Sequence, residues 1–127
     1  MKYLGLDLGE KRVGVAVGEG NLALPLTVLD YHDSDDLALR LSLLVKEHGA
    51  QALVAGEALR PSGNGSAQDD IHKQLAEQLS RQLGLPVYFI DERLTTKQAE
   101  RMRSGVVDDL AAQLILQTYL DQQYGTA

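Results

Sequence analysis

The chain has 127 residues, no cysteine and a formal net charge of −6, a composition that suits a single domain over residues 1–127. The missing cysteines exclude disulfides, thiolate zinc sites and a cysteine nucleophile, and the three histidines are dispersed, so any metal ion would be held mainly by oxygen. The first twelve residues contain too few apolar side chains before the first charges for a secretory signal or a membrane span, so we expect a cytoplasmic protein without a membrane partner.

The first quarter of the chain predicts three antiparallel strands. Residues 2–8 and 12–18 read as strands joined by a tight turn at residues 9–11. A third strand is expected at residues 24–29, after a loop that contains glycine and asparagine. A flavodoxin-like fold would need helices between the early strands, and the short first turn leaves no room for one. We therefore predict an antiparallel meander.

The middle of the chain begins with a helix predicted at residues 34–48. Leucine and valine recur there at helical spacing, with Ser34 as a candidate N-cap and Gly49 as a stop signal. A short apolar strand is expected at residues 51–55. The segment after it, at residues 56–66, is so rich in Gly, Ser, Asn and Pro that we predict a loop. The length of this loop favours a functional role.

The last half of the chain predicts one more strand and three helices. An amphipathic helix at residues 67–83 leads into a strand at residues 86–90, which indicates a parallel crossover. Two terminal helices are expected at residues 95–103 and 108–122. The order of elements predicts an α/β fold with a mixed five-stranded sheet flanked by helices.

The first notable carboxylate, Asp7, interrupts the apolar strand sequence YLGLDLG. Alternation places Asp7 on the same face as Gly5 and Gly9, opposite the leucines. A carboxylate in such a strand costs free energy unless it is paired. It could accept backbone hydrogen bonds from the following turn, or it could belong to a functional site.

A second pair of carboxylates, Asp91 and Glu92, directly follows the apolar sequence PVYFI. The carboxyl end of a sheet strand is a usual position for site residues in α/β folds. An ordinary strand-end turn, with Arg93 as an ion-pair partner, is the alternative. Strand alternation allows only one of the two carboxylates to point into a site.

A third pair, Asp108 and Asp109, opens the last predicted helix, where capping and the helix dipole alone favour aspartate. The rest of that helix is apolar on more than one side, and Ala111 and Ala112 allow close approach, so its first turn should be brought inward. If the three acidic positions converge, they form an oxygen-only site that suits Mg²⁺ or Mn²⁺. Two such ions can support phosphodiester hydrolysis without a protein nucleophile.

The net negative charge is unfavourable for nucleic-acid binding, because lysine and arginine usually supply much of the affinity for phosphates. Several cations nevertheless fall near the acidic motifs and could form a local basic face or an ordinary solvated surface. These are Lys11, Arg12, Arg93, Lys97, Arg101 and Arg103.

Three blocks of sequence, DLGEKRVGVAV, IDERLTT and VDDLAAQLILQTYLD, resemble the YqgF/RuvX family in order and spacing over nearly the whole chain. The resemblance implies an RNase H-like fold related to RuvC-type Holliday junction resolvases. It also implies a nuclease that acts in maturation of the 5′ end of pre-16S rRNA.

By the same resemblance, Asp7 matches the first-strand metal-binding aspartate, Glu92 the acidic residue after the later strand, and Asp108 the aspartate that opens the last helix. Asp91 remains a substitute for Glu92, and Asp109 is a possible additional carboxylate. The implied cofactor is Mg²⁺ or Mn²⁺, and the implied phosphate-facing candidates are Lys11, Arg12 and Arg93.

The sequence departs from the family pattern in two places. Glu57 and Ala58 stand where relatives usually have a Gly-Leu-Pro motif, so Glu57 could join the site. Relatives also carry a longer basic segment before the last helix, whereas this chain has only RMRSGV, which retains Arg101 and Arg103. The shorter segment is expected to weaken nucleic-acid affinity.

Several functions therefore remain open at the level of sequence. A nuclease could act on structured RNA or on branched DNA, and a resolvase that makes paired cuts would favour a homodimer. A catalytically silent module that binds nucleic acid or assembling ribosomes is the alternative from another class. A nucleotide-binding phosphotransferase-like domain is a further alternative, which the short chain opposes because such enzymes bind nucleotide between two domains.

Overall fold

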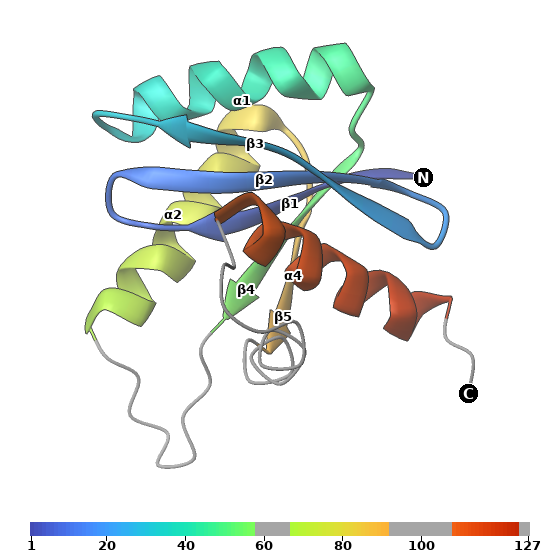
Figure 1. The fold of residues 1–127 in the computed structure, drawn as a ribbon. Coiled ribbons are helices and arrows are strands. Elements are labelled where there is room, and N and C mark those ends of the chain that lie inside the picture. Colours follow the sequence, from blue (N-terminus) through green and yellow to red (C-terminus); the bar gives the residue numbers. More distant parts are fainter. Residues whose placement is uncertain (58–66, 92–107, 125–127) are drawn as a thin grey trace.

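The computed structural model describes residues 1–57, 67–91 and 108–124, with backbone alone at residues 67–70, 108 and 109 (Figure 1). Its five strands form one sheet in the order β3-β2-β1-β4-β5. The strands are β1 (Lys2–Leu8), β2 (Arg12–Glu19), β3 (Leu22–Asp30), β4 (Ala52–Glu57) and β5 (Val87–Asp91). The described helices are α1 (Ser34–His48), α2 (Ala67–Leu83) and α4 (Asp108–Gln123).

The sheet is mixed, as predicted. β1, β2 and β3 pair antiparallel, whereas β4 pairs parallel with both β1 and β5. Helices α1 and α2 cover one face of the sheet and α4 covers the other (Figure 1). On β1, Leu4 and Leu6 pack toward α1 and α2, while Tyr3 packs toward α4. The predicted alternation of β1 is therefore confirmed.

Helix α4 approaches β1 and β2 very closely because glycines lie beneath it. A Cβ atom on Gly5 would lie 2.7 Å from the Cβ of Leu116 and 3.0 Å from the carbonyl oxygen of Ala112. A Cβ on Gly18 would lie 2.8 Å from Cδ2 of Leu116. The expected burial of this helix is confirmed by Ala112, Leu114, Ile115, Leu116, Thr118, Tyr119 and Leu120.

The contacts of α4 also fix its direction. Ala112 lies against Gly5, whereas Leu120, two turns later, lies near Gly18, whose register partner is Tyr3 at the start of β1. The helix therefore runs antiparallel to β1, and its first turn lies toward the carboxyl end of that strand.

Two glutamines attach α4 to the β2–β3 hairpin. Oε1 of Gln117 accepts a hydrogen bond of 2.9 Å from the backbone N–H of Ala23, and Nε2 of Gln117 donates to the carbonyl of Asn21 at 2.8 Å. Gln113 donates through Nε2 to the carbonyl of Ala23 at 3.0 Å. These bonds satisfy backbone groups of the hairpin and hold the helix in register on the sheet.

The N-cap predicted for α1 is wrong by one residue. Asp33, in an extended conformation, caps the helix by accepting a 2.8 Å hydrogen bond from the backbone N–H of Asp36. Ser34 is already helical, and its hydroxyl accepts a hydrogen bond from Nε2 of Gln78 on α2 at 2.9 Å. Gly49 ends the helix in the left-handed conformation, with φ of 67°, as predicted.

The strands extend further than predicted. β4 continues two residues beyond the expected end to Glu57, β5 continues one residue to Asp91, and β3 begins two residues earlier, at Leu22. The predicted loop after Glu57 and the predicted helix at residues 95–103 lie outside the described residues. No helix in the described part of the chain is long and apolar enough to cross a membrane.

The close approach at Gly5 predicts a measurable coupling with Leu116. Gly5→Ala should cost about 1–3 kcal/mol because the new methyl group overpacks the contact, and Leu116→Ala should cost about 2–5 kcal/mol by opening a cavity. The double variant should lose less than the sum of the two losses, because the shorter side chain makes room for the methyl group. Urea unfolding measures these free energies, and strictly additive losses would contradict the proposed contact.

Candidate active site

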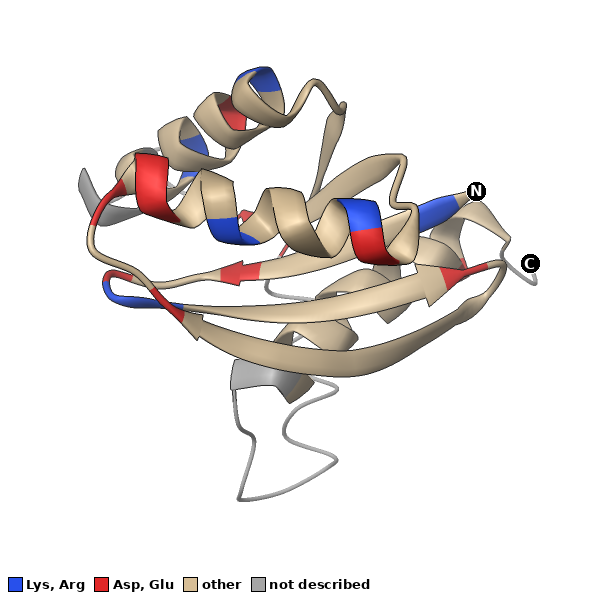
Figure 2. Ribbon diagram, turned by 90° about the horizontal axis from the view of Figure 1, so that it is seen from above, with Lys and Arg blue, Asp and Glu red and all other residues tan. Residues whose placement is uncertain are grey.

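Asp7 lies near the carboxyl end of β1, on the face that α4 covers. It is half-buried and in register with Gly14 of β2. Together with Gly9, Glu10, Lys11 and Arg12 it lines a hollow of about 300 Å³. This hollow combines two carboxylates, Asp7 and Glu10, with two cations, and both cations lie on or beside the turn between β1 and β2, at one end of the sheet (Figure 2).

The turn beside Asp7 has a tightly constrained backbone. The N–H of Gly9 donates to the carbonyl of Arg12 at 3.0 Å, and a Cβ on Gly9 would lie only 2.6 Å from that same oxygen. A side chain at this position would therefore force the turn to move. The turn predicted between the first two strands is confirmed.

Tyr31, which follows β3, stabilises this turn through two hydrogen bonds. Its hydroxyl donates a 2.6 Å hydrogen bond to the carbonyl of Gly9, and its backbone N–H donates to the carbonyl of Lys11 at 3.1 Å. Burial, and secondarily the charge of Glu10, raises the pKa of the Tyr31 hydroxyl, so the hydroxyl remains a protonated donor. Sequence reasoning missed this residue.

The first turn of α4 brings the backbone of Asp108 toward the same end of the sheet. Asp108 begins the helix, and Ala112, one turn later, lies against Gly5 on β1. Because α4 runs antiparallel to β1, its beginning lies toward Asp7. The side chains of Asp108 and Asp109 lie outside the described part of the structure.

Asp91 lies on the other face of the sheet. Along β5, Ile90 is buried in the cluster beneath α4, and Tyr88 stacks on Tyr119 of that helix. Alternation turns Asp91 toward the α2 face, opposite to Asp7. Glu92 lies outside the described residues.

Glu57 shares the α2 face with Asp91, its register partner across β4 and β5. Oε1 of Glu57 lies 3.1 Å from Nζ of Lys73 on α2, and this ammonium also lies 5.7 Å from the centre of the Phe89 ring. The structure therefore joins Glu57 to α2 and separates it from Asp7 by the thickness of the sheet.

The remaining predicted site residues are only partly covered by the structure. Of the cations, Lys11 and Arg12 line the hollow, whereas Arg93, Lys97, Arg101 and Arg103 lie outside the described residues. No group of three potential metal ligands occurs among the described residues. Asp7 is the one member of the expected triad whose side chain falls within them.

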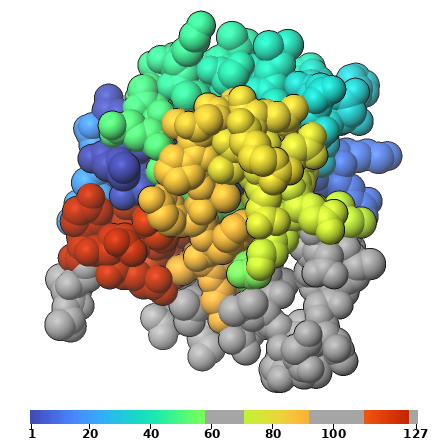
Figure 3. Space-filling view, turned by 180° about the vertical axis from the view of Figure 1, so that it is seen from behind, coloured from blue at the N-terminus to red at the C-terminus, as the bar shows by residue number. Residues whose placement is uncertain are grey.

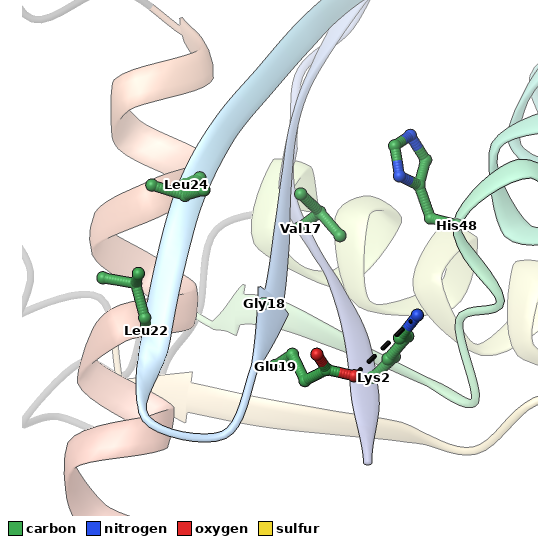
Figure 4. A pocket seen from close by; sticks show the side chains of 7 residues that line it. All are labelled: Lys2, Val17, Gly18, Glu19, Leu22, Leu24 and His48. Atoms are coloured by element: carbon green, nitrogen blue, oxygen red, sulfur yellow. Dashed lines mark ion pairs between the residues drawn. The ribbon is translucent and has the colours of Figure 1, made fainter.

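A second hollow, of about 340 Å³, lies at the opposite end of the sheet (Figure 4). Leu22, Leu24 and Val17 give it an apolar wall, and its carboxylate, Glu19, pairs with Lys2 at 3.8 Å. Its lining thus lacks a grouping of carboxylates, and the hollow beside Asp7 fits the predicted chemistry better.

Comparison with known proteins identifies the family to which this chain is similar. Residues 1–122 match the family described as RuvX, Holliday junction resolvase. A protein of Syntrophus aciditrophicus (strain SB) is 42% identical, covering 95% of this chain and 89% of its own length. A protein of Roseiflexus sp. (strain RS-1) is 34% identical, with coverage of 96% and 95%. Both relatives carry the name of a candidate pre-16S rRNA nuclease.

The fold also has a counterpart among solved structures. RuvC of Thermus thermophilus, in complex with a Holliday junction substrate, superposes with a TM-score of 0.67 and covers 100% of this chain and 98% of its own. Its sequence is 17% identical, so the likeness concerns the fold alone. The predicted RNase H-like fold is confirmed, and with the match over residues 1–122 the chain belongs to the RuvX family of nucleases.

Proposed function

We propose that this RuvX-family chain is a metal-dependent nuclease that hydrolyses phosphodiester bonds of structured RNA, with precursor 16S rRNA as its substrate. The observation that carries the proposal is the position of Asp7. Its carboxylate lies on the α4 face, beside two cations, at the end of β1 toward which α4 begins. Such a site offers a carboxylate for a metal ion and cations for a phosphate.

The proposed metal ligands are Asp7, Glu92 and Asp108. All three donate carboxylate oxygens, the ligands that Mg²⁺ and Mn²⁺ prefer. The half-buried position of Asp7, on a face otherwise packed by apolar side chains, fits a carboxylate whose charge is compensated by a cation. When bound, the metal would supply an activated water and stabilise the leaving oxygen. Asp109 is retained as a possible additional carboxylate.

Glu57 and Asp91 are not part of the proposed ligand set. Both lie on the α2 face, and Glu57 pairs with Lys73. Glu92 is preferred to Asp91 because strand alternation turns consecutive residues to opposite faces. Continued alternation beyond β5 would return the next side chain to the face of Asp7.

Lys11 and Arg12 are the proposed phosphate contacts among the described residues. Their two positive charges balance those of Asp7 and Glu10 in the lining of the hollow, although the whole chain carries −6. Gly9 keeps the turn that carries these two cations tight, because a Cβ there would meet the carbonyl oxygen of Arg12. Arg93, Lys97, Arg101 and Arg103 would extend this contact surface.

The proposed substrate also bears on location and assembly. Processing of precursor rRNA would place the protein in the cytoplasm. Branched DNA is the alternative substrate, and paired cuts on it would favour a homodimer. Cleavage of matched RNA and four-way junction substrates distinguishes the two substrates. Sedimentation of the protein alone shows whether it is a homodimer.

The carboxylate assignment predicts a face-dependent mutational pattern. With Mn²⁺, Asp7→Asn and Asp108→Asn should lower RNA cleavage by roughly 100-fold or more, since even outer-shell changes at metal sites cost 10–100-fold. Asp91→Asn and Glu57→Gln, on the other face, should stay near wild type. Asp121→Asn, at the far end of α4, is the matched control for Asp108→Asn.

Cleavage and binding should be recorded together on proteins whose fold is verified by circular dichroism. Full cleavage by Asp7→Asn would contradict the assignment. Wild-type protein that binds RNA but never cuts it with Mg²⁺ or Mn²⁺ would instead support the catalytically silent binding module.

The hydrogen bond from the Tyr31 hydroxyl to Gly9 predicts a separate effect on activity. Tyr31→Phe removes only the hydroxyl that donates to Gly9, so the turn beside Asp7 loses one support. We expect a stability loss of about 0.5–1.5 kcal/mol and a several-fold fall in cleavage rate. Ser42→Ala, which removes a hydroxyl that donates to the carbonyl of Leu39 within α1, is the control. If Tyr31→Phe cleaves RNA at the wild-type rate at every Mn²⁺ concentration, the hydrogen bond from Tyr31 does not contribute to the candidate site.

A further inference from the structure

Four of the five tyrosines gather at the other end of the α4 face, where β1 and β5 begin and α4 ends. Tyr3 and Tyr119 are buried and meet edge to face, with ring centres 5.5 Å apart. Tyr88 stacks on Tyr119 at 5.6 Å, with an angle of 21° between the rings. Tyr124 interacts with Tyr3 from the last turn.

Tyr88 differs from an ordinary core aromatic because it is held in place yet remains 39% exposed. Its ring rests on Tyr119, which is only 9% exposed and supported in turn by Tyr3. Figure 3 shows β5 at the open surface beside α4. An accessible aromatic ring with a fixed plane is the kind of surface on which unpaired nucleobases stack.

The electrostatic state of the cluster suits a phosphate-bearing ligand. Burial, with smaller contributions from Tyr119 and Tyr124, raises the pKa of Tyr3 to about 12. Burial also raises the pKa of Tyr119. Tyrosine is protonated at neutral pH even without these shifts, and the raised pKa values keep both supporting rings uncharged in alkaline solution as well, so they do not repel a polyanion.

The position of Tyr88 relative to Asp7 suits one bound strand. Tyr88 is in register with Val54, and Val54 with Gly5, so Tyr88 lies two strands from Gly5 on the α4 face. Gly5 is two residues from Asp7. With about 4.8 Å between strands and about 3.3 Å per residue, the two Cα atoms lie roughly 12 Å apart. The straight line crosses Gly5 and Val54, which α4 covers. A bound strand would therefore pass around the helix, and would need more than the roughly four nucleotides, at about 3.4 Å each, that the direct distance requires.

We propose that Tyr88, backed by Tyr119, is a stacking subsite for an unpaired nucleobase that flanks the phosphate at Asp7. This inference rests on the proposed nuclease function. Stacking uses the ring face that every base possesses, so the subsite selects single-stranded flanks over duplex and tolerates any base sequence. It would supply affinity that the acidic chain does not obtain from charge alone.

Binding without cleavage tests the subsite. An RNA hairpin with a single-stranded flank of about eight nucleotides, long enough to pass around α4, is compared with the same hairpin whose flank is abasic, in EDTA, by fluorescence anisotropy. Tyr88→Leu should weaken binding of the normal flank about tenfold, within the range found for loss of one base–aromatic stack. Tyr88→Phe should bind as wild type, and Tyr88→Leu should leave binding of the abasic flank unchanged.

Two controls separate stacking from packing. Leu39→Ala removes an exposed apolar side chain from α1, on the opposite face, and should not alter binding. Unfolding midpoints of all variants show whether the fold is retained. Equal losses on both RNAs, no loss on either, or a change in oligomeric state without a base-dependent loss would overturn the subsite.

The outcome is distinguishable from failure of the proposed function. A base-dependent loss in EDTA supports the subsite even if the wild type cuts no RNA with Mn²⁺. Normal cleavage by Tyr88→Leu without any base-dependent loss leaves the nuclease intact and removes the subsite.

Discussion

The contact between α4 and the glycines of the sheet is the constraint on which the rest of the structure depends. Leu116 lies so close to Gly5 and Gly18 that a Cβ at either position would fall within 3 Å of it. This approach aligns the helix against β1, and Gln113 and Gln117 fix its register on the β2–β3 hairpin. Together these contacts place the first turn of the helix at the carboxyl end of β1, which is the end of the sheet that holds the candidate site.

The two faces of the sheet then divide the carboxylates. Asp7 lies on the α4 face, whereas Glu57 and Asp91 lie on the α2 face, where Lys73 balances the charge of Glu57. Because the sheet lies between them, Asp7 on one face and the pair of Glu57 and Asp91 on the other do not share one cation. The same α4 face carries the Tyr88–Tyr119 stack at its other end, so the residues proposed to meet the substrate lie on one side of the molecule.

Much of this arrangement could be predicted from sequence, because it depends on local pattern. The alternation of YLGLDLG gave the correct face for Asp7, and the apolar last helix was correctly expected to be buried. The faces of Glu57 and Asp91 could not be assigned, since they depend on where β4 and β5 end, and each strand ran beyond its predicted end.

Ser34 was mistaken for the cap because Asp33, Ser34 and Asp36 are all good capping types, and only backbone conformation separates them. Tyr31 was missed because its bond to Gly9 joins residues 22 positions apart; an aromatic residue directly after the third strand was the sole signal.

A crystal structure of the full chain grown with Mn²⁺ would show whether a divalent metal ion binds on the α4 face at the carboxyl end of β1. Anomalous scattering locates the ion without assuming its ligands. We expect an anomalous peak within coordination distance of the Asp7 carboxylate, beside the first turn of α4. A peak between Glu57 and Asp91 on the α2 face, or none at Mn²⁺ concentrations that support cleavage, would contradict it.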